Sequence, residues 1–100
     1  IMNKNKNKIL YVIETDDHYV KVGISNNAKK RFNQIECGSG KKIINSFISE
    51  YTPNAKKIER LIHNRFGRYR KRGEWFYGID YLTVLTHACL YDYSDQEGIY

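Results

Sequence analysis

The chain has 100 residues, of which 41% are hydrophobic and 14% aromatic, so it is expected to fold as one domain rather than remain disordered. Seventeen Lys and Arg against eleven Asp and Glu give a formal net charge of +6, which favours a polyanionic partner without identifying it. No apolar run has the length of a membrane span, and two separated cysteines with three scattered histidines give no support for a zinc site. We therefore expect a cytoplasmic protein with free thiols, whose single domain has its core at about residues 9–91 and loose ends.

Two segments near the start of the chain predict a β-hairpin. Residues 10–13 and 19–24 are rich in β-branched and aromatic side chains, and the segment between them is polar. Period-2 alternation places alternate aliphatic residues on one face of each strand, and this face should be buried. A three-residue loop at 15–17 would pair Val12 with Val20 and Leu10 with Val22.

The other face of the hairpin carries a phenol and an ammonium group. In the same register Tyr11 would lie directly across from Lys21, with Gly23 two residues farther along the strand. A positive neighbour favours phenolate, so Lys21 would lower the pKa of Tyr11. The missing side chain at Gly23 would let a ligand approach closely. The alternative is a solvated sheet face that holds an ordinary Tyr and Lys.

Strand and helix patterns alternate in the rest of the chain. Residues 42–51 predict a third strand. Residues 68–73 form a basic connector, and residues 74–77 after it predict a short strand or edge segment. Caps and hydrophobic spacing predict three helices: Ala28 to about Cys37, Thr52–Pro53 to about Phe66 with Gly67 as C-cap, and Tyr81 to about Tyr91. The last helix would turn these residues inward: Leu82, Leu85, Ala88 and Cys89. The expected fold is α/β, with a small, mainly antiparallel, three-stranded sheet flanked by helices.

Two charged residues lie beside the apolar stripes of the first two helices. Arg31 stands at the margin of its stripe and can reach the sheet. Glu59 projects against the edge of the core, where a carboxylate is costly unless it is paired or holds a metal. An ordinary alternative is a contact between Glu59 and His63, Arg60 or Arg65.

Positive charge is concentrated in two runs, a first at residues 29–31 and a second at residues 65–72. Five cations within eight residues, interleaved with Tyr69, suit a track for phosphate groups, although a solvated face would have the same composition. The first run includes Arg31 and lies in the same predicted helix. The predicted nucleic-acid contacts are Lys29, Lys30, Arg65, Arg68, Arg70, Lys71 and Arg72.

The ordered set of motifs resembles the GIY-YIG nuclease superfamily, specifically its compact phage and bacterial branch, often described as a DNA-binding domain. The resemblance covers about residues 9–79. Its marks are Leu10-Tyr11-Val12 in place of GIY, Lys21-Val22-Gly23 in place of YIG, Arg31 eight residues after Gly23, Glu59 with His63, and Gly73-Glu74-Trp75-Phe76.

The resemblance implies a metal-dependent endonuclease that hydrolyses DNA with one Mg²⁺ or Mn²⁺ ion. It implies Glu59 as the metal ligand, Arg31 as the phosphate contact and Tyr11 as the base or water-orienting group. It also implies that Lys21 lowers the pKa of Tyr11. The bottom-up chemistry agrees, because a guanidinium fork suits phosphate and a carboxylate suits a hard cation. Gly23, His63 and Trp75 would be structural, with His63 forming a hydrogen bond.

The chain departs from the family pattern at three positions. Leu10 stands at the usual glycine, Lys21 at the second tyrosine, and Ile35 where several branches have a histidine. A non-catalytic DNA-binding module on the same scaffold is therefore the main alternative. A protein-interaction domain, such as a regulator or inhibitor, is a third possibility and predicts no DNA affinity at low salt.

Overall fold

A computed structural model describes the backbone of residues 7–97 and the side chains of residues 7–91. Strands and helices alternate along most of the chain, as expected from the sequence. In chain order the elements are β1 (Ile9–Thr15), β2 (Val20–Ser25), α1 (Ala28–Ser39), β3 (Ile43–Ile48), α2 (Ala55–Arg65), the 3-10 turn η2 (Gly67–Tyr69), β4 (Arg70–Arg72), β5 (Trp75–Phe76) and α3 (Tyr81–Glu97).

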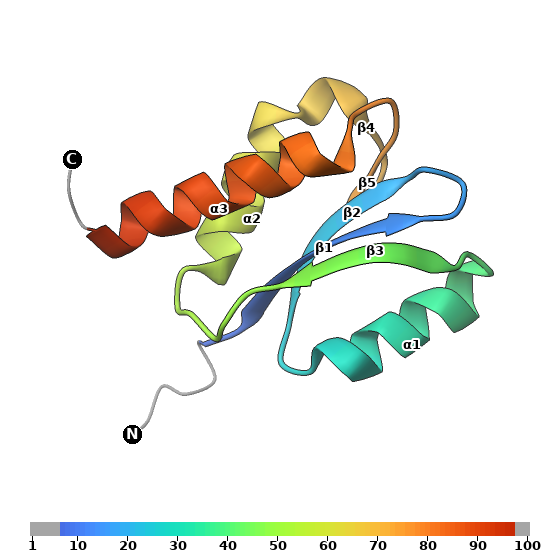
Figure 1. Ribbon diagram of the computed structural model, residues 1–100, viewed down its shortest axis with the longest axis horizontal. Helices are drawn as coiled ribbons and strands as arrows, with labels where there is room; N and C mark the ends of the chain where they lie inside the picture. Colours follow the sequence, from blue (N-terminus) through green and yellow to red (C-terminus); the bar gives the residue numbers. More distant parts are fainter. Residues whose placement is uncertain (1–6, 98–100) are drawn as a thin grey trace.

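The sheet lies between two layers of helix, with α2 and α3 on one face and α1 on the other (Figure 1). Its strand order is β3-β1-β2-β5-β4, and all neighbouring strands are antiparallel. The predicted α/β class is confirmed, but the sheet has five strands rather than three. The basic connector contributes β4, because the chain turns back at Gly73, which has a φ of 55° and whose carbonyl oxygen accepts from Arg70 Nε at 2.7 Å.

The two faces of the sheet cover cores of different size. The smaller core lies under α1 and contains four buried residues, Ile9, Tyr11, Ile13 and Ile35. The larger core packs the opposite face against α2 and α3, and most of the apolar burial that stabilises the fold is here. Its buried members are Leu10, Val12, Val20, Val22, Ala55, Ile58, Ile62, Phe66, Phe76, Tyr81, Val84 and Ala88.

The β1–β2 hairpin has a register that differs from the predicted one by two residues. Tyr11 lies opposite Gly23, and Lys21 lies opposite Ile13. The turn causes the shift, because His18 has a left-handed φ of 68° and its N–H donates to the Thr15 carbonyl oxygen at 2.8 Å, which places the loop at 16–18. A two-residue shift preserves the faces. The side chains predicted to point inward are indeed buried: Leu10, Val12, Val20 and Val22.

The first two helices differ from prediction at their ends. α1 continues two residues past Cys37 to Ser39 and is capped by Gly40, whose φ of 74° is left-handed. α2 begins at Ala55 rather than at Pro53, because Thr52 pairs with Lys8 in an isolated bridge. At its other end Phe66, not Gly67, is the cap, since the chain continues directly into η2.

α3 is longer than predicted and presents a different face. Its backbone is helical to Glu97, so part of the tail predicted to be loose is helix. Two residues predicted to face inward do not, since Leu82 is 63% exposed and Cys89 is also exposed. The inward stripe, at i, i+3, i+4 and i+7, is Tyr81, Val84, Leu85 and Ala88.

The two ends of the chain can be compared with prediction only in part. Residues 3–6 of the lead-in and 98–100 of the tail lie outside the described residues. Lys8, also assigned to the lead-in, is held by backbone hydrogen bonds to Thr52 in both directions. None of the helices within residues 7–97 has the length and apolar character needed to cross a bilayer.

Candidate functional site

Tyr11 and Gly23 form the centre of the candidate site. They are partners across the β1–β2 pair, and the phenol lies over the glycine. A Cβ built on Gly23 would lie 2.6 Å from Cζ of Tyr11 and 3.0 Å from Oε1 of Glu74. The missing side chain therefore accommodates the phenol and a carboxylate of this chain, rather than the ligand that the sequence suggested. Phe32 of α1 packs edge-on against the Tyr11 ring at 5.4 Å.

Lys21 is paired with a carboxylate and not with the phenol. Its strand partners are Ile13 and Trp75, and its Nζ lies 3.1 Å from Oε1 of Glu74 and 5.1 Å from the centre of the Trp75 ring. This position follows from the shifted register. The predicted direct Tyr11–Lys21 pairing is wrong.

The pKa of Tyr11 moves in the opposite direction from the one predicted. Burial is the main cause and raises the pKa above its ordinary value, and the negative charges of Glu74 and Glu59 add to the rise. Arg31 lowers the pKa but does not outweigh burial. The phenol is therefore protonated at neutral pH, where it can donate a hydrogen bond and is not a ready base.

Glu59 lies on α2 at the edge of the larger core, as its place on the helix predicts. Its Oε2 is buried and has no hydrogen-bond partner. Its neighbour is Glu74, rather than the predicted alternatives His63, Arg60 or Arg65. Burial first, and then hydrogen bonding and repulsion with Glu74, raise the pKa of Glu59 to about 7.

Glu74 belongs to the site but was not predicted as a site residue. Burial by itself would raise its pKa, but the hydrogen bond with Glu59 and the charge of Lys21 outweigh burial, so the pKa is lowered. The two carboxyl groups thus share one proton, with the negative charge on Glu74 beside Lys21. The sequence signal was a carboxylate directly before Trp75, in a segment expected to form a sheet edge.

Arg31 reaches the same place from α1, on the face of the sheet opposite to α2 and Glu59. It is exposed on α1, yet its charge acts on the Tyr11 phenol. It also lines a shallow surface pocket together with Lys21 and Trp75. The structure therefore brings Tyr11, Lys21, Arg31 and Glu59 to one region around Gly23, from two strands and two helices.

His63 and Trp75 support this region. Nε2 of His63 donates to the Val22 carbonyl oxygen at 3.3 Å, and the ring packs edge-on against Phe76 at 5.2 Å. Burial lowers the pKa of His63, so the neutral ring is favoured. The predicted structural hydrogen bond of His63 is confirmed. Trp75 is half-buried and packs against the smaller core.

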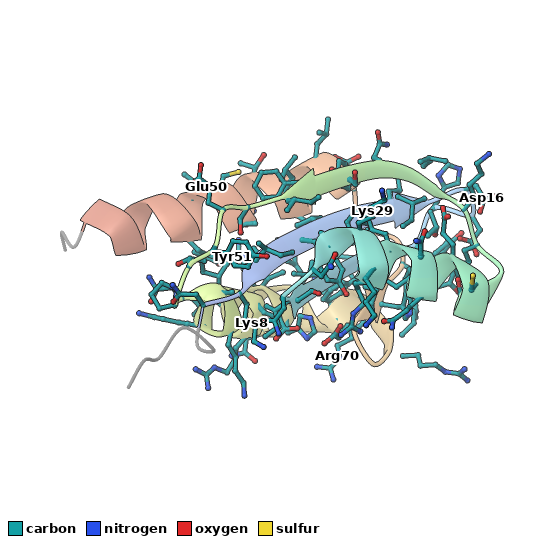
Figure 2. The ribbon with its side chains drawn as sticks, turned by 90° about the horizontal axis from the view of Figure 1, so that it is seen from below. Lys8, Asp16, Lys29, Glu50, Tyr51 and Arg70 are labelled. Carbon is teal, nitrogen blue, oxygen red and sulfur yellow. The ribbon has the colours of Figure 1, made fainter. Side chains whose placement is uncertain are left out.

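The second basic run lies at the far edge of the sheet, beyond the carboxylates. Arg70 is close enough to His63 for its charge to lower the pKa of that ring. In Figure 2 the labelled Arg70 and Lys8 both lie on the lower side of the molecule. Arg68 stacks on Tyr69 at 5.7 Å. The cations of this run are all exposed: Arg65, Arg68, Arg70, Lys71 and Arg72.

The carboxylates fit a hard divalent cation that keeps most of its water ligands. Glu59 offers a buried oxygen with no partner, and Glu74 places a second carboxylate beside it. No group of three or more His, Cys, Asp or Glu side chains that could hold a metal gathers anywhere among the described residues, so an ion here would have only these two carboxylates as protein ligands. An ion here would take the place of the shared proton.

Comparison with protein families gives a match to most of the chain. A family model described as the T5orf172 domain matches residues 8–90, which includes every element that contributes to the site. The searches of curated proteins and of solved structures gave no match.

Proposed function

The chain belongs to the T5orf172 domain family, and from this membership and the arrangement around Gly23 we propose that it is a metal-dependent endonuclease of the GIY-YIG type. The observation that carries the proposal is the convergence of Tyr11, Arg31 and Glu59, in the order that resembles the superfamily motifs. Glu74 and Lys21 complete the site. Its substrate is DNA, in keeping with the net charge of +6.

Hydrolysis of a phosphodiester needs stabilisation of the charge that develops on the phosphate oxygens. Arg31 supplies a planar fork of donors and is exposed, so it can meet a phosphate. Because Lys21 is neutralised by Glu74, most of the positive charge offered to the substrate at this point comes from Arg31.

Tyr11 acts as a hydrogen-bond donor in this proposal. Its raised pKa keeps the proton on the phenol at neutral pH, so it orients the attacking water or a phosphate oxygen rather than removing a proton. Phe32 and Gly23 fix the ring. A base is then available only when Glu74 or Glu59 is ionised.

Glu59 would hold one Mg²⁺ or Mn²⁺ ion, with Glu74 beside it. When bound, such an ion supplies Lewis-acid stabilisation of the phosphate and the leaving oxygen. The protein's part is to hold Glu59 in place, which its helix does through the neighbouring buried residues Ala55, Ile58 and Ile62, while the charge of Lys21 opposes the rise in the pKa of Glu59 that burial causes.

A non-catalytic DNA-binding module is the second candidate. The observations in its favour are the burial of Tyr11, which is 1% exposed, and the raised pKa of Glu59. A phenol that substrate cannot reach and a carboxyl that keeps its proton would leave only the basic surface to act.

Nicking of supercoiled plasmid separates the two candidates. The wild type is incubated with Mg²⁺ or Mn²⁺ beside Glu59→Gln and Tyr11→Phe, and binding to the same DNA is measured in EDTA. The nuclease proposal expects metal-dependent nicking that both substitutions reduce at least a hundredfold, with binding retained. Salt-sensitive binding without nicking supports the module. Nicking that survives both substitutions contradicts the assigned site.

A further inference from the structure

A second surface pocket adjoins the candidate site. It lies where β2 passes into α1, and Arg31 lines both this pocket and the one shared with Lys21. The remaining charged groups on its walls are Lys8 and Lys30. No carboxylate lines it; the other residues are neutral and mostly polar: Ile24, Ser25, Asn26, Asn27 and Gln34.

The three cations of this pocket form no ion pair within residues 7–91, in contrast to two lysines of the protein that do. Lys21 forms an ion pair with Glu74, and Lys41 with Asp17. Within residues 7–91, no Asp or Glu lies within ion-pair distance of Lys8, Lys30 or Arg31. Three like charges around one hollow repel each other, so this place favours an anion.

The walls of the pocket are held in place by backbone contacts. Lys8 is fixed by its backbone hydrogen bonds to Thr52, and the backbone N–H of Lys30 donates to the Asn27 side chain at 3.1 Å. Tyr51 donates from its hydroxyl to the Asn26 carbonyl oxygen and so ties the loop before α1 to the chain after β3. The cations are thus presented from ordered segments.

We propose that this pocket, formed by Lys8, Lys30 and Arg31, binds a backbone phosphate of DNA next to the phosphodiester that is cleaved. Arg31 then stands between two successive phosphates of one strand, because it lines both pockets. The inference rests on the proposed nuclease function and deepens it. It gives the DNA backbone a direction across the site, from the start of α1 toward Lys21 and Trp75.

The test measures DNA binding in EDTA, where no cleavage occurs. The variant Lys8→Gln/Lys30→Gln removes two charges of the pocket but none of the groups around Gly23. The control is Lys42→Gln, an exposed lysine beside Asp16, at the opposite end of β1 from Lys8 (Figure 2). Affinity for a short duplex is recorded by fluorescence anisotropy over a range of salt concentrations.

We expect the double variant to bind about tenfold more weakly than wild type at 50 mM salt. The slope of log affinity against log salt should fall by about 1, the contribution of one neutralised phosphate. Lys42→Gln should match wild type in both. Equal affinities and slopes for all three proteins, with nicking by the wild type intact, would overturn the pocket and leave the nuclease proposal standing. A wild type without DNA affinity at low salt would overturn both.

A neutral phosphate analogue locates the contact. Single methylphosphonate groups are placed in turn on either side of the cleavage position. At one of the two neighbouring positions, the methylphosphonate should weaken binding of the wild type but not of Lys8→Gln/Lys30→Gln. The reason is that the negative charge removed from the DNA and the positive charges removed from the variant contact each other, so removing one leaves the other without effect. Equal losses in both proteins at every position would refute the placement.

Discussion

Gly23 and Tyr11 are direct partners across two strands, and the phenol occupies the space that any larger residue at position 23 would fill. The same space borders Oε1 of Glu74. Gly23 therefore sets the position of the Tyr11 phenol.

Gly23→Ala should displace the phenol. A Cβ would lie 2.6 Å from Cζ of Tyr11, so we expect the free energy of unfolding to fall by about 1–3 kcal/mol and nicking to be lost. Gly38→Ala is the control, because its Cβ would meet no atom within 4 Å and alanine has a higher helix propensity than glycine in the last turn of α1. Chemical denaturation and plasmid nicking measure the two effects. Unchanged values for Gly23→Ala would mean that the phenol position is unimportant.

Stability should depend on pH through Glu59. Its pKa is about 7 in the folded protein against an ordinary value of 4.5, so between these pH values the folded state holds a proton that the unfolded state has released. The free energy of unfolding should therefore fall as pH rises from about 4.5 to about 7. The lowered pKa of Glu74 acts only below about 4.5, where stability falls with falling pH.

Glu59→Gln tests this origin of the pH dependence. The amide stays neutral, so without divalent metal the variant should be more stable than wild type at pH 8, with a flatter profile between pH 4.5 and 7. Glu50→Gln, at an exposed carboxyl, should keep the wild-type profile. Thermal unfolding across the pH range provides the measurement, and a wild-type slope in Glu59→Gln would refute the assignment.

Divalent metal should stabilise the wild type above pH 7. Mn²⁺ at ten times its Kd would add about 1.4 kcal/mol, which raises Tm by several degrees for a domain of this size. Glu59→Gln should show no such rise, and EDTA should reverse it in the wild type. A metal-induced rise of equal size in Glu59→Gln would place the ion elsewhere.

Lys21→Met should act on the carboxylates. Lys21 lowers the pKa of both Glu59 and Glu74, so its loss raises both and moves the onset of Mn²⁺ binding to higher pH. Lys41→Met removes a lysine that is also paired, with Asp17, and should leave the onset unchanged. Titration of Mn²⁺ binding by the rise in Tm at several pH values checks this. An unmoved onset would show that Lys21 does not govern the pair.

The sequence predicted which residues are buried better than which residues meet. Alternation placed Val12 and Val22 on the core face correctly, because the faces follow from the period of the strand alone. The register depended on one residue, His18, with a left-handed φ that is uncommon outside glycine. That single turn decided whether Lys21 would meet the phenol or Glu74.

Glu59 and Glu74 illustrate the same limit within the site. The position of Glu59 at the edge of the core followed from helix periodicity. Its neighbour did not, since Glu74 lies between two short strands, of which β5 pairs with β2 at Lys21 and Val20 and β4 pairs with β5. Such pairs, formed between segments distant in sequence, leave no local pattern.

The helix that carries Arg31 buries fewer residues against the sheet than the helix that carries Glu59. The one buried residue of α1 is Ile35, which is 9% exposed and lies in the smaller core, whereas α2 buries Ala55, Ile58 and Ile62 in the larger one. Amide protons of α1 should therefore exchange with solvent at lower opening free energy than those of α2. Arg31 therefore lies on the less stably packed helix and Glu59 on the more stably packed one, so we expect the guanidinium to change position more readily than the carboxylate.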